Sequence, residues 1–315
     1  MTIRNERIVK GIDYANGVGL ELGPLTSPIL SKQEATIYYL DHMSVEEMKV
    51  KYKDEPVDLD KIVPIDFVLS KNGLKASVGN KRFDYVLASH VIEHIPNVVG
   101  WLQEVYSILK PHGVLSLVVP DKRFTFDIQR RTSSPAEIIG AHIDDIQRFS
   151  STMMYDFASQ YVADVDSGEA WRQPEKVLSQ PRRYTLDETY AMCKQNLDPE
   201  KYVDCHCFTF TPLSFLEVMR RLMEHGLLDY EIAHVLPTYP GELEFYVTLR
   251  KIDRKKVSLK KQLKSIPQLT LEPNPLAELK EENIILKQEI EALKGSVSWR
   301  ATKGLRAARS ILRKN

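Results

Sequence analysis

The chain has 315 residues, of which 43% are hydrophobic and 27% are charged, and its formal net charge is zero. Such a chain can hold one large domain with extensions. We find no apolar run near the roughly 20 residues that a membrane span needs, and residues 1–18 lack the apolar core of a signal peptide. Three cysteines, Cys193, Cys205 and Cys207, do not suggest a disulfide framework. We therefore expect a soluble, cytoplasmic protein.

The charge is unevenly distributed along the chain. Residues 250–264 carry eight Lys or Arg and one Asp, and residues 299–315 carry six Lys or Arg and no acid. Residues 1–249 must therefore be acidic overall. An acidic body argues against a broad phosphate-binding face, so we expect no nucleic-acid partner.

Short apolar segments alternate with helical patterns in the first half of the chain. The strands are expected at 17–23, 35–41, 61–69, 83–88 and 114–120. Ser44 and Glu47 form a capping-box pattern at the start of one helix. A second helix is expected over 97–113, ending at Pro111 and Gly113, with Trp101, Val105, Ile108 and Leu109 on one face.

This alternation predicts a doubly wound, mostly parallel α/β sheet. The regular pattern breaks between about 121 and 205, where a helical insert is expected to form a cap, for example with a helix at 135–148. Thr211-Pro212 opens a further helix, and 230–239 with 242–251 predict an antiparallel hairpin joined at Pro240-Gly241. We expect one domain over 1–252 that includes the insert.

Binding sites of such sheets gather at the carboxyl ends of the strands. Here these ends are expected at Glu21–Gly23, Asp41, Asp66, Ser89–His94 and Pro120–Arg123. Gly23 allows a sharp turn and a close approach of the backbone to a ligand. Asp41, about 20 residues after Glu21, suits the two hydroxyls of a ribose.

These motifs resemble those of the class I S-adenosylmethionine-dependent methyltransferases. The resemblance rests on Glu21-Leu22-Gly23, Asp41, "FDYVLASHVIEHIPN" and "LKPHGVLSLVVPD", and it covers about 17–123 and 230–250. The stretch "HVIEHIPN…WLQEVYSILKPHG" is especially similar to methyltransferases of small molecules and glycans. In detail, Glu21-Leu22-Gly23-Pro24 resembles the "EhGP"-type loops of a bacterial subgroup found around surface-polysaccharide genes.

The resemblance implies a seven-stranded Rossmann-like fold and the cofactor S-adenosylmethionine. It implies O-methylation of a sugar or glycan precursor in surface-polysaccharide synthesis. The cofactor-binding residues would be Glu21, Gly23, Pro24, Asp41, Asp66, Ser89 and His90. Leu25 and Ser27 stand where the family pattern has further glycines. Because the next strand is expected to start at residue 35, shortly after Gly23, the usual first helix must be short or irregular.

Methyl transfer to a hydroxyl requires a base within hydrogen-bond reach. The candidates for a catalytic role are His90, Asp121 and His206. His94 and His142 are weaker candidates, because His94 also fits a structural position at a helix start. Arg123, beside Asp121, could hold an anionic sugar or phosphate.

We expect no metal site. His142 with Asp144 and Asp145 could offer oxygen and nitrogen ligands, but on a helix such residues usually form a solvated face. The Cys-His-Cys run at 205–207 lacks a second ligand pair at zinc spacing. Alternation points Cys205 and Cys207 one way and His206 the other.

The C-terminal region divides into three segments: a charged, Pro-rich linker at 253–275, a short heptad helix at 276–294 and a basic segment at 295–315. In the heptad helix Leu279, Leu286 and Leu293 occupy position d, and Asn283 occupies position a. This pattern predicts a parallel homodimer, and the alternative is a single solvated helix. The segment 295–315 suits a membrane surface, an assembly complex or a disordered tail. Its "SVSWRATKGLR" resembles the ends of bacterial glycan-assembly enzymes.

Three other functions stay open at this point. The altered glycine loop would suit a non-catalytic scaffold whose working part is the heptad helix. A methyltransferase acting on a free metabolite would not need the tail. The third is NAD(P) binding. Gly17, Gly19 and Gly23 match its glycine pattern only poorly, because they lie within the strand rather than at a helix start.

Overall fold

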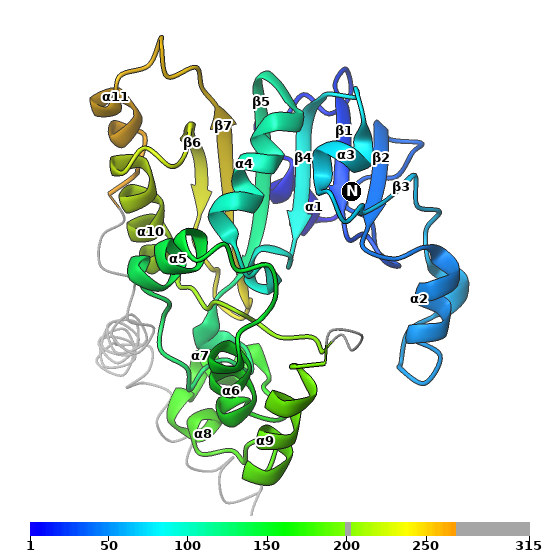
Figure 1. Cartoon of the computed structure of the whole chain (residues 1–315), viewed down its shortest axis with the longest axis vertical. Helices are drawn as coiled ribbons and strands as arrows, with labels where there is room; N and C mark the ends of the chain where they lie inside the picture. The colour runs from blue at the N-terminus through cyan, green and yellow to red at the C-terminus, as the bar shows by residue number, and fades with distance from the viewer. Residues whose placement is uncertain (199–202, 269–315) are drawn as a thin grey trace, which may run out of the picture. The chain divides into compact units, whose positions relative to one another are not determined.

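The computed structural model describes residues 1–198 and 203–268. Its centre is one seven-stranded sheet with the order β3-β2-β1-β4-β5-β7-β6 (Figure 1). The five strands from β3 to β5 run parallel, and β7 pairs antiparallel with both β5 and β6. The strands are β1 (Val18–Leu22), β2 (Thr36–Asp41), β3 (Phe67–Val68), β4 (Phe83–Ser89), β5 (Leu109–Pro120), β6 (Tyr230–Leu236) and β7 (Glu244–Lys251). The predicted doubly wound sheet and terminal hairpin are confirmed.

Helices cover the sheet and build the insert. Those of the sheet layer are α1 (Ile3–Ile8), α3 (Leu74–Val78), α4 (Val98–Ile108), α10 (Pro212–Glu224) and α11 (Leu259–Lys264), whereas α2 (Val45–Lys51) lies apart from the sheet in Figure 1. Those after β5 are α5 (Pro135–Ile143), α6 (Ser151–Gln160), α7 (Ser167–Arg172), α8 (Pro174–Leu178) and α9 (Leu186–Gln195). Three short 3-10 turns are η1 (Leu59–Lys61), η2 (Ile92–His94) and η3 (Lys122–Phe124). In Figure 1, α6 to α9 gather below the sheet.

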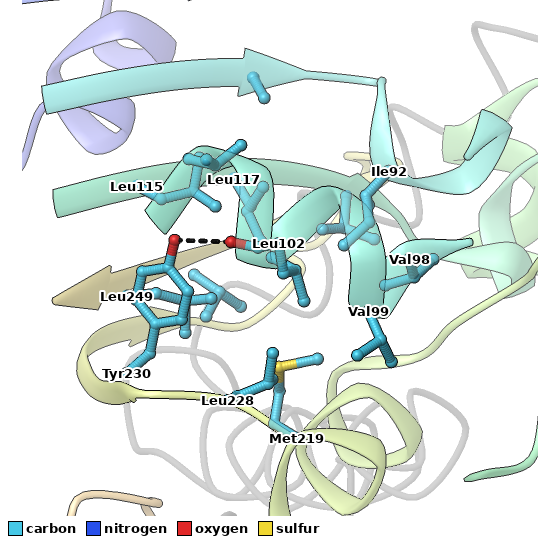
Figure 2. Close-up of a cluster of buried hydrophobic side chains, with 14 of the residues drawn as sticks. Ile92, Val98, Val99, Leu102, Leu115, Leu117, Met219, Leu228, Tyr230 and Leu249 are labelled. Carbon is cyan, nitrogen blue, oxygen red and sulfur yellow. Dashed lines mark hydrogen bonds between the residues drawn. The ribbon is translucent and has the colours of Figure 1, made fainter. Parts of the chain in front are cut away.

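Alternating side chains of the strands feed two separate cores, one on each face of the sheet. Leu20, Val86 and Leu117 pack with α4 and α10 on one face, whereas Tyr85 and Leu87 pack with α1 on the other. On the first face the Tyr230 hydroxyl donates a 3.0 Å hydrogen bond to the Leu102 carbonyl oxygen (Figure 2). Because both faces are covered, the parallel strands are almost continuously buried.

Most local predictions hold, and the exceptions have physical causes. Ser44 and Glu47 form the capping box of α2, and Thr211 caps α10. The helix expected over 97–113 ends at Ile108, because β5 begins at Leu109 and includes Pro111. Its buried face consists of Val98, Val99, Leu102, Val105 and Ile108, while Trp101 is only half-buried.

The segment 253–275, expected to be a linker, contains α11 in its first part. Gln262 of α11 is buried and donates to the carbonyl oxygens of Leu228 and Tyr230, and Ile266 belongs to the same hydrophobic core as the buried face of α10. The body therefore extends past residue 252. The segments 276–294 and 295–315 lie outside the described residues. No helix in the described ranges is long and apolar enough to cross a membrane.

Candidate active site

The strand register brings three predicted residues to one level at the carboxyl edge. Leu22 pairs with Leu40 on one side and with Ala88 on the other, so that the next residues, Gly23, Asp41 and Ser89, leave the sheet side by side. The Gly23 amide donates to the Leu40 carbonyl oxygen at 2.9 Å, which continues the ladder by one bond. The sequence therefore located this edge correctly for β1, β2 and β4.

Gly23 and Asp41 present open backbone and an available carboxylate oxygen at this edge. Gly23 has φ of +67°, and a Cβ there would meet only the Val91 side chain, at 3.9 Å. Asp41 is 6% exposed, and its Oδ1 accepts from the His42 amide at 2.7 Å. Its Oδ2 accepts no hydrogen bond from the residues that the structure describes. A buried carboxylate with a spare oxygen can accept from the hydroxyls of a ribose.

Glu21 shapes the loop after β1 from within. Both of its oxygens accept from the Ile29 amide, at 2.8 and 3.0 Å. Burial raises the pKa of this carboxyl to about 7, against the opposing effects of the Ile29 and Leu30 amides and the positive charge of Arg4. Glu21 thus closes the loop on itself.

A short or irregular helix was expected between β1 and β2, and the structure has no helix there. Leu25 takes a left-handed φ of 45°, and its carbonyl oxygen accepts from the Val63 amide at 2.9 Å. Pro24 is buried beneath this turn. From the N-terminal side, Asn5 of α1 donates to the Ile29 carbonyl oxygen at 2.8 Å. Helix α1 therefore holds the far end of this loop at Ile29.

A charged network joins the ends of β4 and β7. His90, with φ of 53°, places Nε2 2.7 Å from Glu244 Oε2, and Arg4 donates to both oxygens of Glu244 and to the Ser89 hydroxyl. The Tyr246 hydroxyl also donates to Glu244 at 2.8 Å. Burial raises the pKa of Glu244, but hydrogen bonds from His90 and Arg4 outweigh it and lower the pKa to about 2. An ionised Glu244 requires a hydrogen of His90 on Nε2, so that in the neutral ring Nδ1 is the nitrogen that can accept a proton.

Asp66 does not end its strand as predicted, whereas Asp121 follows β5 as predicted but is engaged by other residues. Asp66 precedes β3 instead of ending it, and its carboxylate binds Lys32 Nζ at 2.7 and 2.8 Å and the Tyr39 amide at 2.8 Å. Asp121 is fully buried and bonded to Arg123 and the Thr238 hydroxyl. Both carboxylates are used in holding loops, so the structure gives neither a free oxygen at the site.

His206 lies near Glu93, an acidic residue that the sequence reasoning did not single out and that also lies beside His90. Its Nδ1 lies 2.6 Å from Asp127 Oδ2, and its ring stands edge-on to His94 at 4.6 Å between centroids. Glu93, which is fully buried, places Oε1 3.6 Å from His90 Nδ1. The alternation expected at 205–207 does not separate these side chains: Cys205 and Cys207 lie in different hydrophobic clusters, and the His206 ring packs against Phe126 and Phe157 of the cluster that holds Cys205.

The alternative metal site at the end of α5 is not assembled. His142 Nδ1 lies 3.2 Å from Asn97 Oδ1, and Asp144 and Asp145 are exposed.

The sequence reasoning missed Arg4, Glu93, Asp127 and Glu244. Arg4 and Glu244 lie 240 residues apart, and only the antiparallel pairing of β7 with β5 brings Glu244 level with Pro120 at the carboxyl edge. The one available signal was the Glu93-His94 pair directly after β4, a polar pair inside an otherwise apolar stretch.

Comparisons with known proteins bear on the family of the chain. A family model described as a methyltransferase domain matches residues 12–175. A search of curated proteins gave no match.

Solved structures also align with the chain. The CcbJ methyltransferase from Streptomyces caelestis is 16% identical, with 42% of this chain and 56% of that chain aligned at a TM-score of 0.29. An S-adenosylmethionine-dependent methyltransferase from Mesorhizobium loti is 12% identical over 76% of this chain and 92% of that chain, at a TM-score of 0.38. A methyltransferase from Pyrococcus furiosus is 11% identical over 79% and 82%, at a TM-score of 0.35. The chain thus spans little more than half of the CcbJ chain.

Proposed function

Because the chain belongs to the methyltransferase-domain family, we propose that it transfers a methyl group from S-adenosylmethionine to a hydroxyl of a sugar or glycan precursor. The observation that carries the proposal is the carboxyl edge of β1 and β2, where an open Gly23 lies beside the carboxylate of Asp41. The sugar acceptor is supported by the resemblance of the sequence to glycan methyltransferases.

The residues at this edge fit the cofactor. Asp41 has a spare carboxylate oxygen for the ribose hydroxyls, and Gly23 lets the ligand approach the backbone, since no side chain stands in the way. The methionine end would lie against the loop that Glu21 and α1 hold. When bound, S-adenosylmethionine supplies a methyl group on a positively charged sulfur, which is open to in-line attack.

The protein must then position the acceptor and take its proton. The His90–Glu244 pair suits this task, because Glu244 fixes the ring of His90 through Nε2 and leaves Nδ1 to accept a proton. Arg4 holds Glu244 from the other side and so keeps the pair in place. The insert helices α5 to α9 follow β5 and would shape the acceptor pocket.

A transfer assay tests this proposal. Purified full-length protein is incubated with methyl-labelled S-adenosylmethionine and a panel of sugar nucleotides and lipid-linked sugars, and products are identified by mass spectrometry. We expect a methylated sugar from the wild type and a kcat about 100-fold lower or more for His90→Gln. His112→Asn, at an exposed left-handed position, is the matched control and should keep full activity. Equal rates for both variants would contradict the assigned role of His90.

The loop without a helix favours one alternative, a non-catalytic scaffold. In that case Asp41→Ala would leave the cellular function intact, while deletion of 276–315 would abolish it. The methyltransferase proposal expects Asp41→Ala to abolish function.

For the C-terminal region we propose that the heptads at 276–294 form a homodimer. We further propose that the basic segment at 295–315 attaches the enzyme to the inner face of the cytoplasmic membrane or to an assembly complex. Activity of a 1–268 truncation on soluble sugar nucleotides, equal to that of the full chain, would point instead to a free metabolite as acceptor.

A further inference from the structure

Three potential metal ligands converge beside the proposed site. Glu93 and His94 come from η2, directly after β4, and His206 comes from the segment that precedes α10. One ligand atom from each lies within 4.8 Å of the other two. The two segments are joined by the Cys207 amide, which donates to the Glu93 carbonyl oxygen at 2.7 Å. The backbone therefore fixes the cluster from both sides.

Glu93 is the residue whose position calls for an explanation. Its side chain is 1% exposed, and neither carboxylate oxygen has a hydrogen-bond partner. The nearest nitrogens, His90 Nδ1 and His94 Nε2, are 3.6 and 3.9 Å from Oε1, which is beyond hydrogen-bond distance. A buried carboxylate without a donor is costly, whereas coordination of a cation would satisfy it.

Each histidine has a carboxylate on its far side, but only the carboxylate beside His206 is placed for a hydrogen bond. His206 Nδ1 lies 2.6 Å from Asp127 Oδ2, which leaves Nε2 as its ligand atom. His94 Nδ1 lies 2.9 Å from Asp204 Oδ1, while its Nε2 faces Glu93. Asp127 is in turn held by Arg130 at 2.8 Å. Carboxylates that hold the outer nitrogen of a histidine are the usual second layer of protein metal sites.

We propose that Glu93, His94 and His206 bind one divalent first-row transition metal ion. Two imidazole nitrogens and one carboxylate oxygen suit Zn²⁺, Fe²⁺ or Co²⁺ better than Mg²⁺ or Ca²⁺, which prefer oxygen. Bonds of about 2.0–2.1 Å to a tetrahedral ion set the donors roughly 3.4 Å apart. His94 Nε2 lies 3.9 Å from Glu93 Oε1 and the three donors lie within 4.8 Å of one another, so the side chains must close on the ion by about 1 Å. Three protein ligands leave a coordination position open.

The open position gives the ion a role in the proposed reaction. Glu93 Oε1 lies 3.6 Å from Nδ1 of His90, the proposed base. An acceptor oxygen bound to the ion would therefore lie close to that base, and its hydroxyl would lose a proton more easily. This role rests on the proposed function, whereas the metal site itself does not.

Metal binding is measured without any methyl donor or acceptor. The full-length protein is freed of metal with EDTA, dialysed and titrated with Co²⁺, and then with Zn²⁺ against a chromophoric chelator. We expect one equivalent of Co²⁺ with visible ligand-field bands and no thiolate charge-transfer band, because no cysteine is a ligand. Zn²⁺ should raise the Tm of the metal-free protein, since it binds only the folded state.

Variants assign the ligands. Glu93→Gln and His206→Gln should each weaken Zn²⁺ binding by about 100-fold or more, and Asp127→Asn, which removes only the outer carboxylate, by about 10- to 100-fold. His225→Gln, at an exposed position after α10, is the control and should bind as the wild type does. Circular dichroism establishes that each variant is folded.

Two outcomes would overturn the proposal: a wild-type protein that gives no Co²⁺ bands at one equivalent, or folded Glu93→Gln and His206→Gln variants that bind Zn²⁺ like the wild type. The first measurement uses the wild type alone and holds even if the variants do not fold. If metal binds while no methyl transfer is found, the site stands and the proposed function fails. If transfer proceeds unchanged in EDTA, the role in acceptor binding fails and the site stands.

Discussion

The buried carboxyl of Glu21 offers a prediction whose size follows from the structure. Its pKa rises from 4.5 to about 7 on folding because burial disfavours the charged form. Between these two values the folded state holds a proton that the unfolded state has lost, so the free energy of unfolding must fall as the pH rises through this window. A shift of roughly 2.5 units corresponds to about 3 kcal/mol.

Replacement of Glu21 by glutamine removes the titration and keeps an acceptor for the Ile29 amide. We therefore expect the wild type to lose about 3 kcal/mol relative to Glu21→Gln between pH 4 and pH 8. Urea unfolding of both proteins at intervals of half a pH unit, followed by circular dichroism, measures this difference.

The exposed Glu55 provides the matched control, because Glu55→Gln changes the same chemical group where it is in water. Its curve of unfolding free energy against pH should run parallel to that of the wild type. If the Glu21→Gln curve is also parallel to the wild type over pH 4–8, the carboxyl is not desolvated in the folded protein, and the account of the loop is refuted.

Three further changes test other parts of the structure. Gly19→Ala would place a Cβ 2.1 Å from the buried Tyr85 ring, and we expect a loss of about 1–3 kcal/mol in urea unfolding. Tyr230→Phe removes the hydrogen bond to the Leu102 carbonyl oxygen and should cost about 1 kcal/mol by the same assay. Glu244 has its pKa lowered to about 2 through His90 and Arg4 despite burial. The free energy of unfolding of the wild type should therefore fall as the pH falls from about 4.5 to about 2, whereas Glu244→Gln should lack this part of the fall. Acid unfolding of both proteins measures the difference. An unchanged stability of Gly19→Ala or Tyr230→Phe, or an equal loss of stability between about pH 4.5 and about pH 2 in Glu244→Gln and in the wild type, would contradict the corresponding contact.

Local patterns predicted the parts of the fold that depend on neighbouring residues. Ser44 with Glu47, and Thr211 before Pro212, cap helices as their spacing indicated. The apolar stretches 83–88 and 114–120 became central strands, because only continuous burial on both faces accommodates such runs. Asp41 lies at the carboxyl edge because it is the last residue of the mostly buried strand β2.

Tertiary contacts decided what the patterns could not. Asp121 follows β5 as predicted, yet Thr238 and Arg123 occupy its oxygens, and no local pattern encodes a partner 117 residues away. Asp66 was misplaced because β3 is only two residues long, Phe67–Val68, and Pro64 obscured its start. Glu93 gained its significance only when the chain brought His206 to it.

Calorimetric titration of the purified full-length protein with S-adenosylmethionine measures whether the edge with Gly23 and Asp41 binds the cofactor. We expect the wild type to bind one equivalent. We also expect that Asp41→Asn, which removes the charged acceptor of the ribose hydroxyls, weakens binding about 10-fold or more. The exposed Asp54 supplies the control, since Asp54→Asn should bind as the wild type does. Absence of binding by the wild type, or equal affinity of Asp41→Asn, would contradict the account.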